Sequence, residues 1–270
     1  MRTDLVTTLA LAALTLTMAT GCPRDIPPPT NAIKSPGLFK AAVDARAEQI
    51  RTARFKEVVL EYFGEDERVK VRQLILVEQP DRLMVQTRLP GTNEVMSMLV
   101  SDGEAFSVHQ RDTNTYYTGR PTRENINELL PLDLSARDVT RVMFGGAPWD
   151  RFAQENSLLQ IEWDRKEGNY RAWVETRRGG ELSMAVRAND FAVTSVTEKG
   201  ADGATLYRYT SEDWEGHGEV ALPRYRRFVW PAKNLDFSLD VGETQVDVSF
   251  PENMFKFPPP EGSQVIRMGD

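Results

Sequence analysis

Cysteine and histidine are nearly absent from this chain of 270 residues. Cys22 is the only cysteine, which excludes an internal disulfide and a thiolate metal cluster. The two histidines, His109 and His217, are too few for most histidine-based metal sites. The sequence also lacks G-x-S-x-G, H-E-x-x-H and Walker A motifs. We therefore expect a protein that is not an enzyme and that uses no metal and no cofactor.

Positive charge is scarcer than negative charge, with 33 Lys and Arg against 40 Asp and Glu. No basic stripe follows the sequence, so nucleic acid is not an expected partner. Acidic residues gather at 65–67 and at Asp236, Asp240 and Asp247, where clustered oxygens could hold Ca²⁺. A hairpin tip and a solvated strand face explain them better. The hydrophobic content of 40% is enough for a folded core.

Residues 1–21 predict a signal peptide. A short positive start precedes the apolar run from Leu5 to Ala19, which is too short for a comfortable transmembrane helix. Small residues lead up to Cys22 as in a lipobox, which predicts cleavage between Gly21 and Cys22 and lipidation of Cys22. The alternative is a secretion signal followed by an incidental cysteine. Residues 22–36, which are rich in proline, then predict an extended tether.

The stretch from 81 to 110 predicts three consecutive antiparallel strands, over 83–88, 95–100 and 105–109. Leu89-Pro90-Gly91-Thr92 suits a type II turn, because proline fixes φ and glycine accepts a positive φ. Asp102-Gly103 is a two-residue hairpin signal. The first of these turns would carry an exposed leucine, Leu89.

Apolar residues recur at helical spacing after Ser35-Pro36, which predicts one helix near the start of the domain. Two short helices are predicted over 121–131 and from Ser135 to Gly145. Period-two alternation predicts two strands between 54 and 77 and a long run of strands between 158 and 250, including one over 246–250. The chain is therefore mainly β, of the α+β class.

Three motifs follow one another in a characteristic order: LVSDG at 99–103, VMFGGAP at 142–148 and FKFPPPEGSQV at 255–265. Together with the lipobox they resemble the LolA and LolB lipoprotein-localisation carriers of the Gram-negative periplasm. The resemblance covers roughly residues 36–267. It implies one half-barrel domain over 37–270, in which a strongly bent antiparallel sheet stays open. An N-terminal helix and two short lid helices complete the implied fold.

The same resemblance implies a membrane-release loop at Leu89, Pro90 and Gly91, although a single exposed apolar residue is ordinary on any surface. It also implies an apolar cavity on the concave side of the sheet, for acyl chains. Most aromatic residues are simply core, so the cavity candidates are assigned by strand face. They are Leu83, Val85, Leu99, Phe106, Leu129, Met143, Phe144, Trp173, Tyr207, Tyr209, Phe228, Trp230, Phe237 and Leu239.

The function implied is that of a monomeric lipoprotein anchored in the inner leaflet of the outer membrane and facing the periplasm. It would bind acyl chains of lipoproteins or another amphiphile, with a soluble periplasmic carrier as a partner, and pass them to the membrane. Pro23, which follows Cys22, does not signal inner-membrane retention. The alternative is a structural or assembly lipoprotein of the envelope that acts through protein contacts without lipid cargo.

Overall fold

The computed structural model describes residues 25–64, 68–92, 94–129, 133–155 and 157–269. The predicted signal peptide, Cys22 and the acidic residues 65–67 lie outside these ranges. A helix, α1 (Pro36–Ala47), opens the described domain, and a first series of antiparallel strands follows it. These strands are β1 (Thr52–Phe63), β2 (Arg68–Glu78), β3 (Arg82–Arg88), β4 (Val95–Ser101), β5 (Phe106–Gln110) and β6 (Thr115–Gly119).

Three short helices separate this series from a second one: α2 (Arg123–Leu129), α3 (Ala136–Met143) and α4 (Trp149–Ala153). The second series holds β7 (Gln160–Asp164), β8 (Asn169–Glu175), β9 (Glu181–Arg187), β10 (Val193–Lys199), β11 (Thr205–His217), β12 (Val220–Trp230) and β13 (Leu235–Asp240). The short 3-10 helix η1 (Pro231–Lys233) joins β12 to β13, and β14 (Glu243–Val246) and β15 (Gln264–Arg267) follow. The sequence predicted α2 and α3 but not α4.

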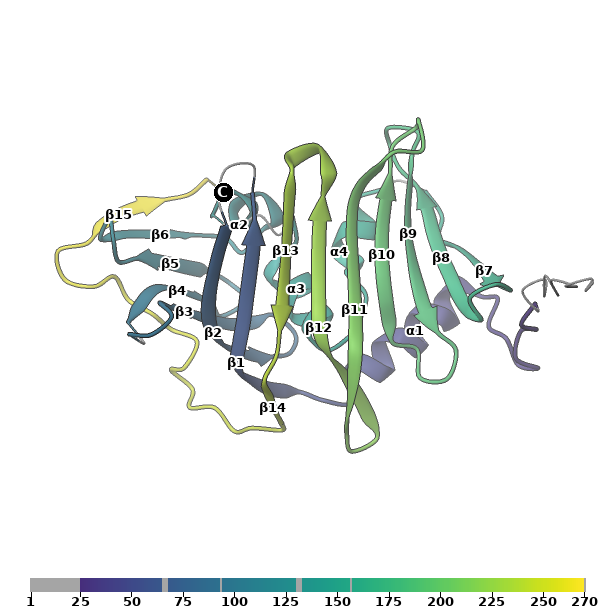
Figure 1. The fold of residues 1–270 in the computed structure, drawn as a ribbon, viewed down its shortest axis with the longest axis horizontal. Coiled ribbons are helices and arrows are strands. Elements are labelled where there is room, and N and C mark those ends of the chain that lie inside the picture. The colour runs from purple at the N-terminus through teal and green to yellow at the C-terminus, as the bar shows by residue number, and fades with distance from the viewer. Residues whose placement is uncertain (1–24, 65–67, 93, 130–132, 156, 270) are drawn as a thin grey trace, which may run out of the picture.

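All strands belong to one sheet, which runs in the order β15-β6-β5-β4-β3-β2-β1-β13-β12-β11-β10-β9-β8-β7, with β14 beside β1. The two series meet where β1 pairs with β13, for example Leu60 with Leu239. The described sheet does not close, since β15 and β7 remain at its edges. Figure 1 shows β3–β6 running across the direction of β8–β13, so the sheet bends strongly. The predicted open half-barrel is confirmed.

The helices lie against one face of this sheet, behind it in Figure 1. Phe39 and Val43 of α1, Val142 of α3 and Phe152 of α4 join inward-facing strand residues in one buried core. The strand faces follow the period-two pattern of the sequence. On β9, for example, Leu182, Met184 and Val186 are buried and their neighbours are half exposed.

Three local predictions differ from the structure. The segment 246–250 is no strand, because β14 ends at Val246. Asp102-Gly103 is not a two-residue hairpin turn but part of a four-residue connection over 102–105. There the Asp102 carboxylate accepts hydrogen bonds from the backbone N–H groups of Glu104 and Ala105. The loop at Leu89 is longer than a four-residue turn, since the Leu89 N–H donates to Glu94 O.

The C-terminal segment crosses the outer face of the sheet, opposite the helices. Phe255 makes a second small core there with Leu76, Met84 and Val100. The chain then adds β15 beside β6 in parallel, with Val265 opposite Tyr116. A parallel edge strand has no turn or hairpin signal next to its partner, which is why the local sequence pattern does not predict it.

The proline-rich segment packs on the β7–β8 hairpin from Ile26 onward. The Ile26 N–H donates to Arg165 O over 2.7 Å, and Trp163 Nε1 donates to Ile26 O over 2.8 Å. Gly168 has φ +67°, and a Cβ added there would lie 2.8 Å from the Ile26 side chain. This part of the predicted tether is therefore docked on the domain.

Candidate functional site: an apolar pocket beneath helix α3

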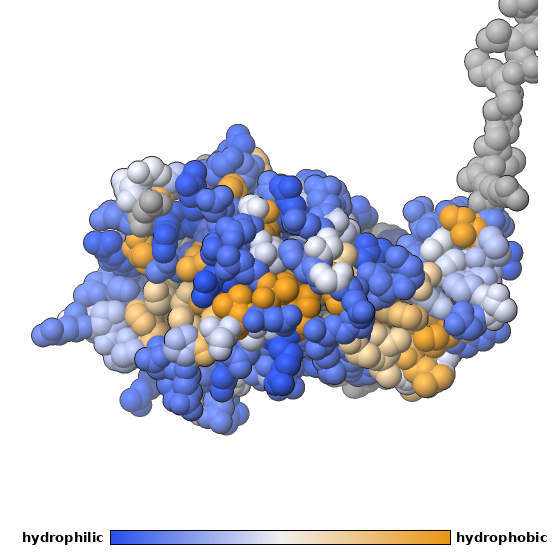
Figure 2. Space-filling model, turned by 90° about the horizontal axis from the view of Figure 1, so that it is seen from below, coloured by the Kyte–Doolittle hydropathy of each residue, from blue (hydrophilic) through white to orange (hydrophobic). Residues whose placement is uncertain are grey.

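An apolar pocket of about 450 Å³ lies between the bent sheet and α3. The lining contains no Asp, Glu, Lys, Arg or His; its polar members are Tyr62, Gln73, Thr87 and Ser97. The remaining lining residues are Leu60, Val69, Val71, Ile75, Leu83, Val85, Met96, Leu99, Val108, Leu134, Val139, Val142, Met143, Phe228, Phe237 and Leu239. Figure 2 shows that apolar side chains also gather in a band on the molecular surface, between hydrophilic margins.

Strand alternation turns these side chains toward the pocket. On β2, Val69, Val71 and Ile75 face inward, while Arg72 points to the outer face. Phe228 on β12 and Phe237 on β13 stack with centroids 4.6 Å apart and form one wall. The pocket therefore lies where β1–β5 turn away from β12 and β13.

Helix α3 roofs the pocket and begins at a side-chain cap. Ser135 Oγ accepts from Asp138 N over 3.1 Å and donates to Asp150 Oδ2 over 2.8 Å. The Asp138 carboxylate does not reach back to Ser135, as a capping box would require. It accepts instead from the backbone N–H groups of Asp150 and Arg151, at 3.1 and 2.9 Å, and so joins α3 to α4.

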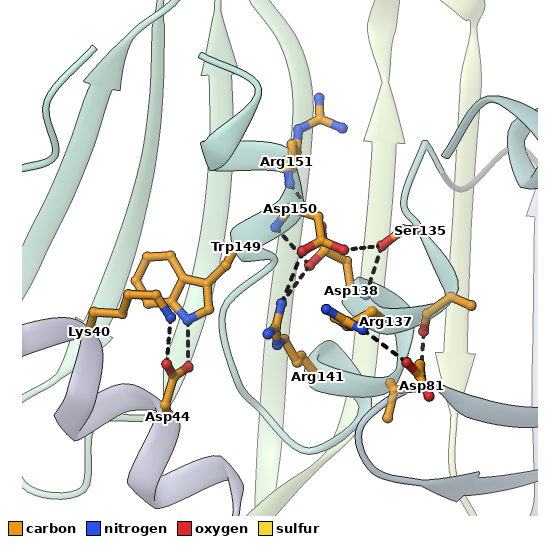
Figure 3. Close-up of polar contacts among 12 residues, drawn as sticks. Lys40, Asp44, Asp81, Ser135, Arg137, Asp138, Arg141, Trp149, Asp150 and Arg151 are labelled. Atoms are coloured by element: carbon orange, nitrogen blue, oxygen red, sulfur yellow. Dashed lines mark hydrogen bonds and ion pairs between the residues drawn. The ribbon is translucent and has the colours of Figure 1, made fainter. Parts of the chain in front are cut away.

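Figure 3 shows how polar contacts tie these helices to their surroundings. Arg137 of α3 forms an ion pair with Asp81 beside β3, at 3.1 Å. Trp149 Nε1 of α4 donates to Asp44 of α1 over 2.6 Å, and Lys40 pairs with the same carboxylate. The roof is thus fixed to both the sheet and α1.

Two buried arginines hold the other end of α3. Arg46 donates to Phe144 O, and Arg226 Nη2 donates to Met143 O over 2.7 Å. These carbonyls lie at the negative end of the helix, where a cation is favourable. Burial lowers the pKa of both Arg46 and Arg226 to about 10, so both guanidinium groups remain charged at neutral pH.

Burial, and secondarily the neighbouring Asp150 carboxylate, raise the pKa of Asp138 to about 7. The Asp138 side chain is only 1% exposed, so its charged form has little access to water. The joint between α3 and α4 therefore contains a carboxyl that titrates near neutral pH.

Half of the predicted cavity residues line the pocket: Leu83, Val85, Leu99, Met143, Phe228, Phe237 and Leu239. Phe106, Phe144, Tyr207, Tyr209 and Trp230 are buried in the core outside it, and Leu129 packs on that core. Trp173 lies on the outer face of β8, where the Arg171 guanidinium carbon is 5.6 Å from its ring centre. The alternation on β8 puts Ala172 and Val174 inside and Trp173 outside.

The predicted release loop lies apart from the pocket lining. Leu89 is 37% exposed, and Gly91 has φ +89°, a left-handed conformation that favours glycine within this longer loop. Asp236 and Asp240 pair with Arg227 and Arg224 on the outer face, as solvated strand carboxylates do. The described residues contain no cluster of His, Cys, Asp or Glu that could hold a metal ion.

Several lining residues were not predicted, among them Leu60, Tyr62, Val71, Ile75 and Val142. Their period-two or helical spacing identifies an inward face, but it does not distinguish the pocket from filled core. Within the described part of the chain, no helix combines the length and apolar character that crossing a membrane needs.

The open, strongly bent sheet with helices on one face defines the class of the protein: it has a LolA-like half-barrel fold. No protein-family model and no curated protein matches the sequence. The solved structures that resemble it include a LolA superfamily protein from Nitrosomonas europaea. That structure has a TM-score of 0.55 and 11% identity, over 84% of this chain and 99% of that one.

Two further structures share the fold. A Vibrio parahaemolyticus domain, described as belonging to an outer membrane lipoprotein-sorting protein, has a TM-score of 0.59 and 9% identity over 81% of this chain and 95% of its own. A DUF1329 family protein from Desulfovibrio piger has a TM-score of 0.58 and 13% identity over 81% of this chain and 97% of its own. At these identities the likeness establishes the fold alone.

Proposed function

We propose that this protein binds the acyl chain of a lipoprotein or of another amphiphile in the pocket beneath α3. The observation that carries the proposal is an apolar volume of about 450 Å³ with no charged lining residue, left open by the protein's own side chains. Burial of apolar surface drives such binding without metal or covalent chemistry. The Vibrio domain's description as a lipoprotein-sorting protein supports this function.

The pocket volume limits the cargo. Benzene fits a cavity of about 150 Å³, or roughly 25 Å³ per carbon. A pocket of 450 Å³ would then hold on the order of 18 carbons. That is enough for one long acyl chain but not for the three of a mature bacterial lipoprotein, so further chains would need the pocket to widen.

A fluorescent fatty acid titrated into residues 23–270 tests this proposal. Leu239→Trp should fill the pocket and weaken uptake at least tenfold, because Leu239 lines it. Ser238→Trp, on the other face of β13, is the matched control and should bind like the parent. Equal uptake by both variants would show that the pocket is not the binding site.

The anchor belongs to the same proposal and rests on the lipobox pattern around Cys22. One acyl chain, at about 0.8 kcal/mol per buried CH₂, anchors only marginally, whereas several anchor durably. We expect palmitate labelling of the expressed protein in the outer-membrane fraction, and none for Cys22→Ala. Labelling of Cys22→Ala would contradict lipidation at this residue.

In the same proposal, a soluble periplasmic carrier delivers the lipid cargo to this protein. The protein then passes the cargo to the membrane, and Leu89 in the release loop assists this transfer. The alternative remains an assembly lipoprotein of the envelope that carries no lipid. It predicts no fatty-acid uptake by the parent and a stable protein partner that co-purifies without lipid.

A further inference from the structure

A second groove, of about 610 Å³, lies on the outer face of β1–β3, opposite the pocket. Arg54, Arg72 and Arg88 line it. The sheet separates the two sites, since Arg72 points outward while its neighbour Val71 lines the pocket. The groove is therefore a separate site, and it does not depend on the function proposed above.

The arginines of this groove have no carboxylate partner among the described residues. Arg72 and Arg88 stand directly opposite each other on β2 and β3, and Arg88 donates only to the Gln86 side chain. On β12, by contrast, the outward-facing Arg227 bonds to Asp236.

Two further charges line the groove, Lys56 and Glu57. Lys56 is already paired with Glu243 at 3.1 Å. Glu57 is the only acid among the lining residues. The three arginines therefore leave a local excess of positive charge in a chain whose net charge is −7.

Opposed like charges cost stability. Directly opposite residues of an antiparallel pair have Cβ atoms about 5 Å apart, and like charges there are unfavourable. An anion between the two guanidinium groups would remove the repulsion. Arginine forks match the geometry of phosphate oxygens, which makes a phosphate group the fitting anion.

The floor of the groove is apolar. Leu74 lies between the arginine pair and Arg54, beside Met254 of the C-terminal segment, whereas Leu76 and Met84 lie in the same row as Arg54. Arg54 is opposite Leu76, four residues along β2 from Arg72, or roughly 13 Å at the usual rise per residue. An inorganic phosphate would use only the arginine end, whereas an amphiphile would use both.

We propose that this groove binds an anionic phospholipid. The phosphate lies between Arg72 and Arg88, and the first part of an acyl chain lies along Leu74, beside Met254. The domain would thus hold a second lipid on its outer face, recognised by its charge, while the pocket beneath α3 recognises only apolar surface.

Short-chain lipids below their micellar concentration test the proposal on residues 23–270. Dihexanoyl phosphatidylglycerol should raise the unfolding temperature, and dihexanoyl phosphatidylcholine should do so much less, because its head group has no net charge. Inorganic phosphate should bind at least tenfold more weakly than the anionic lipid. Equal binding of both lipids, or equal binding of inorganic phosphate, overturns the proposal.

Variants locate the site. The double variant Arg72→Gln/Arg88→Gln should weaken binding of the anionic lipid at least tenfold, whereas Arg227→Gln, a paired arginine on the same face, should not change it. Leu239→Trp, which fills the other pocket, should also leave it unchanged. Undiminished binding by the double variant, or lost binding in Leu239→Trp, overturns the assignment.

The repulsion between Arg72 and Arg88 can also be tested without a ligand, through the unfolding temperature of the protein. In low salt, Arg72→Gln should unfold at a temperature equal to or above that of the parent, and added salt should shrink any difference. A lower unfolding temperature would show that Arg72 stabilises the fold by itself, and would count against a site built for an anion.

Discussion

Asp138 links α3 to α4 through two backbone N–H groups, and it does so from a buried position. A carboxyl whose folded pKa is about 7, against about 3.9 when unfolded, binds more protons in the folded state between these values. Its contribution to stability is therefore full at low pH and falls as pH rises from about 4 to about 7.

Asp138→Asn should flatten this dependence. The fall in the free energy of unfolding between pH 4.5 and pH 8 should shrink by on the order of 2–4 kcal/mol relative to the parent. Urea unfolding at the two pH values measures it. Asp112→Asn, at an exposed turn, is the control and should leave the slope unchanged. An unchanged slope in Asp138→Asn would mean that this carboxyl does not titrate in that window.

At the scale of elements, α3 is attached at its C-terminal end by buried cations. Arg226 is fully buried, and its Nε and Nη1 atoms have no partner among the described residues. A buried charge so poorly compensated adds little net stability. Its hydrogen bond to Met143 O nevertheless fixes where α3 ends.

Arg226→Met should therefore affect the global stability and the local stability of α3 differently. The global free energy of unfolding should stay level or rise, because an apolar side chain of similar length replaces a desolvated charge. Amide hydrogen exchange in 139–144 should accelerate, since the carbonyls lose a donor. Unchanged exchange in α3, measured by mass spectrometry, would show that Arg226 does not hold the helix. Arg224→Met, an exposed arginine on the same strand, is the control.

The C-terminal segment is the second element that needs a tertiary partner. Phe255 is 3% exposed and packs on Leu76, Met84 and Val100. Phe255→Ala should cost about 3 kcal/mol of unfolding free energy through lost burial and a cavity. Phe63→Ala, at a 39% exposed phenylalanine, should cost much less. Denaturant unfolding compares them, and equal losses would mean that the segment does not stabilise the domain.

At the scale of the whole molecule, the docking of Ile26 shortens the proposed anchor. Only four residue steps separate Cys22 from Ile26, a reach of at most about 14 Å. A lipidated Cys22 would then keep the β7–β8 end of the sheet next to the bilayer. Figure 1 places the β3–β4 loop, which holds Leu89, at the other end of the long axis.

Ile26→Asp should weaken the docking of this segment, because a carboxylate replaces the apolar side chain that packs on Gly168. Proteolysis of residues 25–34 should then become faster, with the rest of the domain intact. Leu158→Asp, at an 83% exposed leucine, should not change the cleavage rate. Mass spectrometry of the fragments measures both, and equal cleavage of Ile26→Asp and the parent would contradict a docked segment.

Local sequence patterns predicted most of the strands, their faces and the start of two helices. Period-two alternation on β8 and β9, Ser35-Pro36 before α1 and Ser135 before α3 are local signals, and each acts within a few residues. Leu83, Val85 and Leu99 were predictable as inward-facing residues because the strand face decides which side chains point inward.

Which inward residues line open space depends on how the helices and the bent sheet pack together. Tyr207 and Trp230 face inward like Phe228, yet Arg151 of α4 lies over the Tyr207 ring, 4.2 Å from its centre, and Tyr207 in turn packs on Trp230. The parallel β15, the Phe255 core and the opposed pair Arg72 and Arg88 also depend on contacts between distant segments. Local periodicity cannot specify such contacts, because the bend of the sheet and the placement of its helices bring those residues together.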